Sequence, residues 1–373
     1  MSYIVQDRIE ISVLFGNLNY PLNQFNSLNY LHLGSSVKVL VPTLKLSVVD
    51  QSGMLNNGLL VDGLEITIVL KTIGSNDTSL QYKFTLTGIE STTVENGTNY
   101  TIYGMGGGLQ FFANTALTGI RGTSNDVIKE IANRCGLLYE GTNTSDSQLW
   151  MPQNRTWAVF ARNVAKAGYV NDRSFMRLAC TLDGRLRYLN LSNPGESVAT
   201  LVQGHIQPNM IPVLFHEPKI SNGPNNIMSG YGLHRYKQSI DSPELRDKVT
   251  YVPDSRTPML NTQAKNQAGR GIITYSPLDF GNNNESYEAA IYQNRRLGSL
   301  YSVGCDFITT YATGLSVLDR INFASEQDSG EVDNSVTGQY ILTAHAILVQ
   351  GTNYYEKLEG FRQGTNWSSD GTR

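Results

Sequence analysis

Apolar and polar residues alternate over several segments before about residue 105, and this period of two constrains the fold more than any other feature of the sequence. Because successive side chains of a strand point to opposite faces, each segment has one apolar face. Short polar loops join the segments without an intervening helix, which is typical of an antiparallel sheet or barrel. The apolar face consists of Leu44, Leu46 and Val48 in segment 44–50 and of Leu64, Ile66, Ile68 and Leu70 in segment 63–70.

One hairpin-like pattern occurs at both ends of the chain, around the tetrapeptide GTNY, which begins at Gly97 and again at Gly351. Each copy follows an alternating segment, and the segment after it reaches a glycine, Gly104 in the first copy and Gly360 in the second. We expect Gly97 and Gly351 to have positive φ in the turns, and the first turn to span the polar stretch STTVENGT. Turns rich in Asn and Gly look alike in any β-rich protein, but strand-rich blocks at both ends favour a duplicated sheet motif.

The apolar period changes to that of a helix after about residue 119. Thr123 or Ser124 is suited to the N-cap of a first helix, which Gly136 would end, and Thr156 and Gly168 bound a second helix in the same way. The apolar stripes are Val127, Ile128, Ile131 and Ala132 in the first helix and Trp157, Phe160, Ala161 and Val164 in the second.

Two strand-like segments follow the second helix, on either side of Asp183 and Gly184. This dipeptide is typical of a two-residue hairpin turn. Helices and hairpin together predict a small α+β insert, which we assign to residues 119–200.

The expected fold class is therefore mainly β, with an α+β insert between two antiparallel β-rich domains. The first domain is predicted at 1–118 and the second at 201–362, with strands from just after the insert available to complete the first. Within the second domain, strand-like patterns resume near Ile220, and segment 285–297 is predicted to form a helix. A loose polar tail is expected at 363–373.

Charged residues make up only 16% of the chain, and its formal net charge is -3. This balance argues against sequence-specific nucleic-acid binding and against binding to anionic lipid. No apolar run approaches the roughly 20 residues that a membrane-spanning helix needs, and the start lacks the pattern of a secretory signal. Cys135, Cys180 and Cys305 form no CxxC pair, which favours buried, reduced thiols in a protein that folds in a cytoplasm.

Catalytic and metal-binding patterns find little support in the sequence. None of the five histidines lies in an HExxH motif, and His345 stands in an apolar strand where a packed side chain is expected. A glycine-rich stretch after Tyr103 has Leu109 where the third glycine of GxGxxG should stand. The acidic loop 325–335 lacks the glycine spacing of an EF-hand, so a solvated loop is favoured and a weak cation site stays open. We predict neither an enzyme nor a bound cofactor.

Three segments carry a family resemblance. The first is TSNDVIKEIANRCGLLYE, a helix leading to Gly-Leu and a strand, and the second is TWAVFARNVAKAGYV with the hairpin around Asp183 and Gly184. The third is the terminal element from Leu318, whose characteristic positions are Gly338, Tyr340, His345, Tyr354 and Arg362. In this order and spacing, spread between residues 8 and 362, they resemble the baseplate hub proteins of tailed phages. These are similar to the amino-terminal hub part of type VI secretion spike proteins.

The resemblance implies a homotrimer in which each chain contributes two tail-tube-like antiparallel β-barrel domains, so that three chains form a pseudo-sixfold ring. Such a ring would nucleate a sixfold tail tube and join it to a threefold central spike. The implied partners are the tail tube protein, the central spike protein and other baseplate proteins, with a tape measure protein as a further candidate. The expected location is the tail baseplate of a virion, after assembly in the host bacterial cytoplasm.

The sequence leaves three alternatives open. A type VI secretion or pyocin-like injection machine would use a hub of the same architecture. A receptor-binding or carbohydrate-binding β protein would fit the 20 tyrosines. An enzyme could also assemble its active site from distant segments.

Overall fold

The structure is a computed structural model. It describes residues 3–5, 9–23, 26–56, 58–73, 79–168, 170, 174–192, 195–204, 209–219, 232–238, 246–252, 272–276, 303–325 and 336–362. The predicted helix at 285–297, the acidic loop after Ser325 and the tail at 363–373 lie outside these residues.

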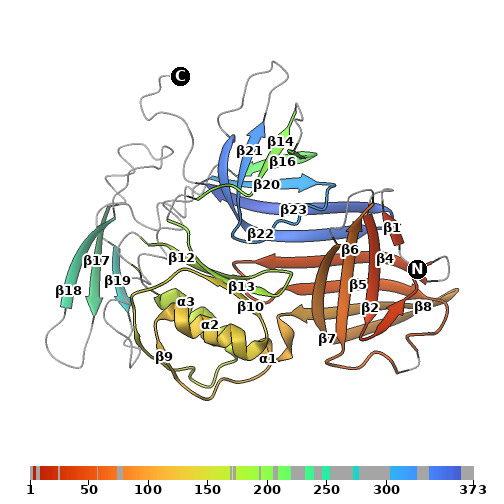
Figure 1. Cartoon of the computed structure of the whole chain (residues 1–373), viewed down its shortest axis with the longest axis horizontal. Coiled ribbons are helices and arrows are strands. Elements are labelled where there is room, and N and C mark those ends of the chain that lie inside the picture. The colour runs from red at the N-terminus through yellow and green to blue at the C-terminus, as the bar shows by residue number, and fades with distance from the viewer. Residues whose placement is uncertain are drawn as a thin grey trace.

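The molecule is mainly β, as predicted. Strands from the part of the chain before the insert and from the part after it belong to one large sheet (Figure 1). The strands of this sheet that precede the insert are β1 (Tyr3–Val5), β2 (Ile9–Phe15), β3 (Leu18–Tyr20), β4 (Asn26–Ser36), β5 (Thr43–Asp50), β6 (Glu65–Thr72), β7 (Ser79–Val94) and β8 (Gly97–Gly106). Those that follow it are β14 (Ala199–Gln203), β15 (Ile211–Pro212), β16 (Phe215–Lys219), β20 (Val303–Thr309), β21 (Arg320–Ser325), β22 (Gly338–Gln350) and β23 (Asn353–Arg362). A separate sheet contains β17 (Gly232–Gln238), β18 (Arg246–Val252) and β19 (Ile272–Ser276).

The same strand order occurs twice in the large sheet. The first unit has the neighbours β2-β6-β7-β8-β5-β4, and the second has β14-β21-β22-β23-β20-β16. The order along the chain matches as well. Strands β2, β4, β5, β6, β7 and β8 of the first unit correspond, in that order, to β14, β16, β20, β21, β22 and β23 of the second. The units differ at one end, where β2 pairs with β6 antiparallel and β14 pairs with β21 parallel.

A β-bulge identifies equivalent residues in the two units. The register of β7 with β8 shifts between Leu86 and Gly88, and that of β22 with β23 shifts between Leu342 and Ala344. Next to the bulge, Leu86 pairs with Gly104 and Leu342 pairs with Gly360. Residues 86–94 and 97–104 of the first hairpin therefore correspond to 342–350 and 353–360 of the second.

The two GTNY tetrapeptides are not at equivalent positions in these hairpins. In the first hairpin the turn is 95–96, and the tetrapeptide begins β8 at Gly97. In the second the turn is Gly351 and Thr352, and the strand starts at Asn353. The predicted positive φ is present at both glycines, 150° at Gly97 and 54° at Gly351. The two hairpins are equivalent, but matching their GTNY tetrapeptides does not bring equivalent residues into line.

The prediction of a long polar turn over STTVENGT is wrong. Its first four residues continue β7 as far as Val94, and they pair with β8. Because residues 89–94 are exposed on both faces, their side chains show no apolar alternation. Backbone pairing therefore extends this hairpin beyond the part that sequence periodicity reveals.

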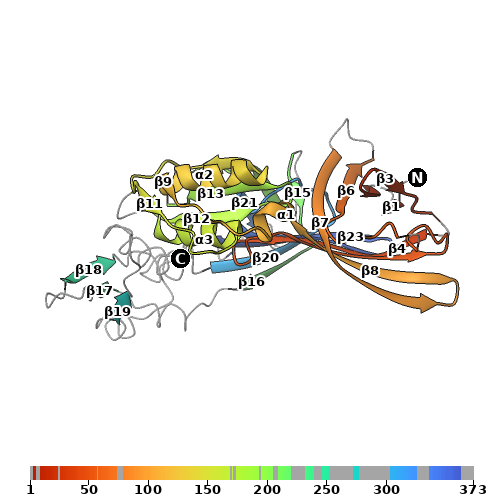
Figure 2. The ribbon, with the colours of Figure 1, turned by 90° about the horizontal axis from the view of Figure 1, so that it is seen from below.

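Three helices lie between the two units in the sequence, α1 (Gly108–Phe112), α2 (Ser124–Cys135) and α3 (Trp157–Ala167). Thr123 is the N-cap of α2 and forms a capping box with Asp126, and Gly136 ends the helix with φ 70°. Thr156 caps α3 as predicted. The apolar stripes of α2 and α3 pack into one core with α1. Helices α2 and α3 lie side by side (Figure 2).

Short strands complete this part of the chain, and we call it, together with the three helices, the helical region. They are β9 (Ile120–Gly122) paired with β11 (Gln148–Trp150), and β10 (Leu138–Gly141) in the order β10-β13-β12 with β12 (Met176–Cys180) and β13 (Arg185–Asn190). The predicted hairpin is formed by β12 and β13. Its loop spans 181–184 rather than two residues, because the Arg185 amide donates to Thr181 Oγ1 and Gly184 takes a φ of 78°.

The cores show how the units are connected. Residues 344–350 of β22 pair with 30–36 of β4, and this is where the second unit joins the first. Ile347, Val349 and Tyr354, which belong to strands of the second unit, lie in the core of the first. Each unit therefore depends on the other for part of its hydrophobic burial.

Candidate functional site

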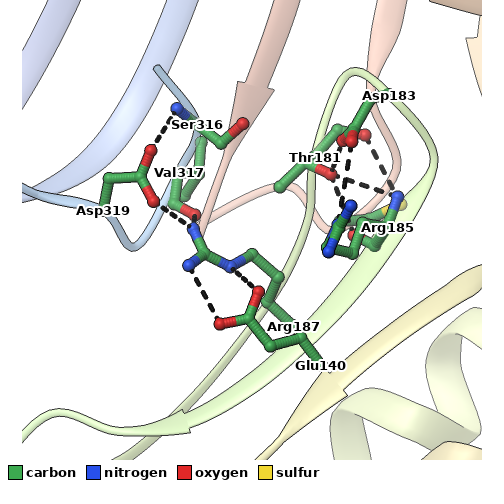
Figure 3. A network of polar contacts seen from close by, with 9 residues as sticks. Glu140, Thr181, Asp183, Arg185, Arg187, Ser316, Val317 and Asp319 are labelled. Atoms are coloured by element: carbon green, nitrogen blue, oxygen red, sulfur yellow. Dashed lines mark hydrogen bonds and ion pairs between the residues drawn. The ribbon is translucent and has the colours of Figure 1, made fainter. Parts of the chain in front are cut away.

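Arg187 connects the helical region to the second unit (Figure 3). From strand β13 its Nη1 donates to Val317 O at 2.8 Å and to Asp319 Oδ1 at 2.7 Å. Its Nε and Nη2 donate to the Glu140 carboxylate at 3.0 and 3.2 Å. Burial disfavours the charged guanidinium, but the two carboxylates outweigh this effect and raise the pKa of Arg187 above its ordinary value.

Asp319 is itself held in place, because its Oδ2 accepts from the Ser316 amide at 2.7 Å. The small apolar cluster around the contact includes Phe175, Val317 and Ile341 from both regions. Polar and apolar contacts thus fix the orientation of the helical region on the sheet.

Two of the positions that carry the family resemblance meet at a buried carboxylate. Glu356 accepts from Tyr354 Oη at 2.5 Å and from Thr313 Oγ1 at 2.5 Å, and His345 Nε2 lies 3.4 Å from Glu356 Oε2. His345 and Glu356 are both buried. Burial by itself would raise the pKa of Glu356, but His345, Thr313 and Tyr354 together lower it below its ordinary value. His345 is packed, as predicted, and Glu356 supplies its charged neighbour.

The other three terminal positions meet at the opposite end of β22. Arg362 Nη1 donates to Thr337 O at 2.6 Å, and its guanidinium lies 5.4 Å from the centre of the Tyr340 ring. A Cβ at Gly338, where φ is 153°, would lie 2.5 Å from Arg362 Nη1. These positions therefore shape the second unit. The remaining two, Asp183 and Gly184, lie apart from them in the β12–β13 loop.

One continuous row of strands crosses both units, in the order β16-β20-β23-β22-β4-β5-β8-β7, and we call it the strand row. One face of the row packs on the cores, and we call the other the open face. On the open face Asp306 binds Lys219 and Lys357, each at 2.8 Å. Burial alone would raise the pKa of Asp306, but the two lysines lower it below its usual value.

The first unit has its own polar cluster at the corresponding place on the open face. Lys45 Nζ lies 5.9 Å from the centre of the Tyr30 ring and 5.7 Å from that of Tyr103. Tyr103 Oη donates to Glu90 Oε2 at 3.2 Å. The open face thus presents fixed charges from both units.

The two ends of the strand row are exposed. The tip of the β7–β8 hairpin extends beyond the neighbouring strands (Figure 2). Ile89 and Val94 are exposed apolar residues on it, and Phe215 is exposed on β16 at the other end of the row. Exposed strand edges of this kind are potential sites for pairing with another chain.

The sequence analysis did not identify the two buried charged residues, Glu356 and Arg187, that organise these contacts. Glu356 shares the side of β23 with Tyr354 and Leu358, so its place among core positions was a readable signal of a buried charge. Arg187 also stands within an alternating strand, but its partner Asp319 is far away in the sequence, and no local signal connects them.

The described residues contain no group of three or more His, Cys, Asp or Glu that could hold a metal ion. Among the helices in the described part of the chain, none is long and apolar enough to span a membrane.

No family model and no curated protein matches the amino-acid sequence. Solved structures do match the fold. A tail protein from Neisseria meningitidis MC58 is similar with a TM-score of 0.62 and 10% identity over 95% of this chain and 96% of that one. The 43 kDa tail protein of prophage MuSo2 from Shewanella oneidensis has a TM-score of 0.62 and 11% identity over 95% and 98%.

A third similar structure is an E. coli protein described as a component of the type VI secretion system with structural similarity to the T4 bacteriophage tail proteins gp27 and gp5. The TM-score is 0.53 and the identity 8%, over 97% of this chain and 78% of that one. The chain thus has the fold of phage tail proteins along nearly its whole length, which confirms at the level of fold the resemblance to baseplate hub proteins.

Proposed function

We propose that this protein is a baseplate hub, a structural component of a phage tail that forms a trimeric ring between the sixfold tail tube and the threefold central spike. The observation that carries this proposal is the repeated strand order within one chain. A trimer of such chains presents six similar sheets around one axis, and it keeps true threefold symmetry. One ring can then match a sixfold partner on one side and a threefold partner on the other.

The role is mechanical in this proposal. The ring nucleates the tube and holds the spike through large interfaces, and no chemical step is required. Its partners are the tail tube protein, the spike protein and other baseplate proteins. It acts in the tail of a virion, after assembly in the host cytoplasm.

The test is the native mass of the purified protein by light scattering, with particles imaged from the same sample. We expect a trimer of about 124 kDa, three times 41.2 kDa, whose ring has sixfold-looking density. The measurement is repeated with the spike protein present, because a hub can require its partner to assemble. A chain that stays monomeric under both conditions would contradict the proposal.

A second candidate is the hub of a type VI secretion or pyocin-like injection machine. The similarity to the type VI component, which covers 97% of this chain, favours it. The two candidates share the ring and differ in its partners. Binding of the purified ring to tube protein from a phage tail, compared with the type VI tube protein, separates them.

A further inference from the structure

The junction between the two units within one chain is a template for a contact between chains. At this junction β22 of the second unit pairs antiparallel with β4 of the first over residues 344–350 and 30–36. In the repeated strand order, β7 of the first unit occupies the place of β22, and β16 of the second unit occupies the place of β4. β7 and β16 are the two ends of the strand row.

Both counterparts have an edge available in the described part of the chain. Residues 88–94 of β7 pair with β8 on one side, whereas β6 pairs with β7 only over its earlier residues. Strand β16 pairs with β20 on one side. Side chains on both segments are exposed, with Phe215 at 52% and Val94 at 38%.

The strand directions at the two ends are compatible with pairing. Every neighbouring pair in the strand row is antiparallel, from β16 through β22 and β4 to β7. A β16 strand placed beside β7 of another copy, in the manner of β4 beside β22, is therefore antiparallel as well.

The register can be transferred from the internal junction. At that junction Gly34 pairs with Ala346 and Tyr30 pairs with Gln350. The bulges in the two hairpins make Glu90 the counterpart of Ala346, and Val94 the counterpart of Gln350.

The counterparts of the β4 residues follow from the ladders that lead to them. In the first unit Leu33 pairs with Leu44, which pairs with Gly104 on its other side. In the second unit Pro218 pairs with Cys305, which pairs with Gly360. Gly104 and Gly360 are equivalent by the bulge alignment. Leu33 therefore corresponds to Pro218. The residues opposite one another in the transferred register are Phe215 with Val94, Glu217 with Thr92, and Lys219 with Glu90.

These pairs are chemically matched. Phe215 and Val94 are exposed apolar residues that would cover each other, and Lys219 and Glu90 have opposite charges on the open face. Pro218 has no N–H to donate, so the pairing relies on the other backbone groups and on the side-chain pairs.

We infer that β16 of one copy pairs antiparallel with residues 88–94 of β7 in the next copy, with Phe215 opposite Val94 and Lys219 opposite Glu90. This inference rests on the proposed trimeric hub, and it specifies which strands close the ring. The contact is heterologous, and it repeats the internal junction, so alternating internal and external junctions join the six units of a trimer into one continuous sheet.

The test is disulfide trapping in the full-length chain. A variant with Phe215→Cys and Val94→Cys places two thiols at Cβ separations that a disulfide can bridge. The three native cysteines are buried. We expect oxidation to give covalent dimers and trimers on a non-reducing gel and nothing larger, because a closed ring has no free end. A matched control variant, Phe215→Cys with Thr93→Cys, shifts the register by one residue and should link poorly, since its side chains point to opposite faces.

A second in-register pair, Glu217→Cys with Thr92→Cys, provides the same test at another position if the first variant fails to fold. If the trimer forms but neither in-register pair links, or if the shifted pair links equally well, the strand assignment is wrong and the hub proposal stands. If no trimer forms with or without the spike protein, both fall together.

Discussion

Glu356 illustrates how this fold accommodates a carboxylate in a core. Its oxygens accept from Thr313 and Tyr354, and His345 lies beside it in the second unit. In the first unit the bulge alignment places Tyr100 at the position of Glu356 and Ile89 at that of His345. The two units therefore share a backbone arrangement and differ in the polarity of this site.

The variant Glu356→Gln is expected to lower the free energy of unfolding by about 2 kcal/mol at pH 7, because it weakens the charge-assisted hydrogen bonds that the carboxylate accepts from Thr313 and Tyr354. The pKa of Glu356 is lowered in the folded protein, so its contribution is present above the unfolded-state pKa and is lost as pH falls through the folded value. Chemical denaturation at several pH values measures this.

The matched control is Glu359→Gln, on the same strand, where the carboxylate is partly exposed and lies 3.7 Å from Lys38. Its loss should be below about 1 kcal/mol. A Glu356→Gln variant whose stability followed that of the control across the whole pH range would contradict the assigned role.

The two tetrapeptide glycines should respond differently to substitution. A Cβ at Gly97 would lie 2.6 Å from Asp50 O, whereas a Cβ at Gly351 has nothing within 4 Å. Gly351→Ala should cost about 1 kcal/mol from its positive φ alone, and Gly97→Ala should cost at least twice that. Denaturation midpoints of the two variants, measured side by side, test this, and equal losses would mean that the sites are equivalent after all.

At the scale of the elements, what the sequence predicted is mostly local. The caps at Thr123 and Thr156 and the glycine after α2 are encoded within a few residues, so both helices were predictable. Strands with one buried face, such as β5 and β6, were also readable from their alternation. The far part of β7 has no buried face, and it was mistaken for a turn.

Pairing between distant strands could not be read in the same way. The junction of β22 with β4 and the equivalence of β7 with β22 depend on contacts between segments far apart in the chain. The GTNY match pointed to the correct pair of hairpins, but it aligned them wrongly, because a turn tetrapeptide reports local backbone preference and not register.

The anchoring of the helical region gives a prediction at this scale. Replacing Arg187 with Met removes the partner of Asp319 across the contact and the partner of Glu140 within the helical region. We expect a loss of about 3 kcal/mol and faster hydrogen exchange at β10 and at residues 315–319, since the docked arrangement loses its central donor.

Arg185→Met is the matched control, because Arg185 is more exposed and its ion pair with Asp183 is a long contact of 3.7 Å. It should leave exchange at residues 315–319 unchanged. Equal exchange in the two variants would show that apolar packing alone holds the helical region in place.

At the scale of the whole molecule, β22 has the central place. It pairs with β4, β21 and β23, so it belongs to the second unit and also completes the first. Because the two units share this strand, we expect them to unfold together, which is compatible with the proposed ring between tube and spike. If the proposed ring forms, the same sharing couples its assembly to the folding of the chain at this strand.

Two truncations test that coupling. A chain ending at Val336 lacks β22 and β23, which contribute Ile347, Val349 and Tyr354 to the core of the first unit, so we expect no ring and a loss of cooperative unfolding. A chain ending at Arg362 retains all of the large sheet and should assemble as the full chain does. Light scattering and thermal unfolding of both, beside the intact protein, make the measurement. A ring formed by the shorter chain would place the junction elsewhere, because in that chain β4 has no β22 to pair with.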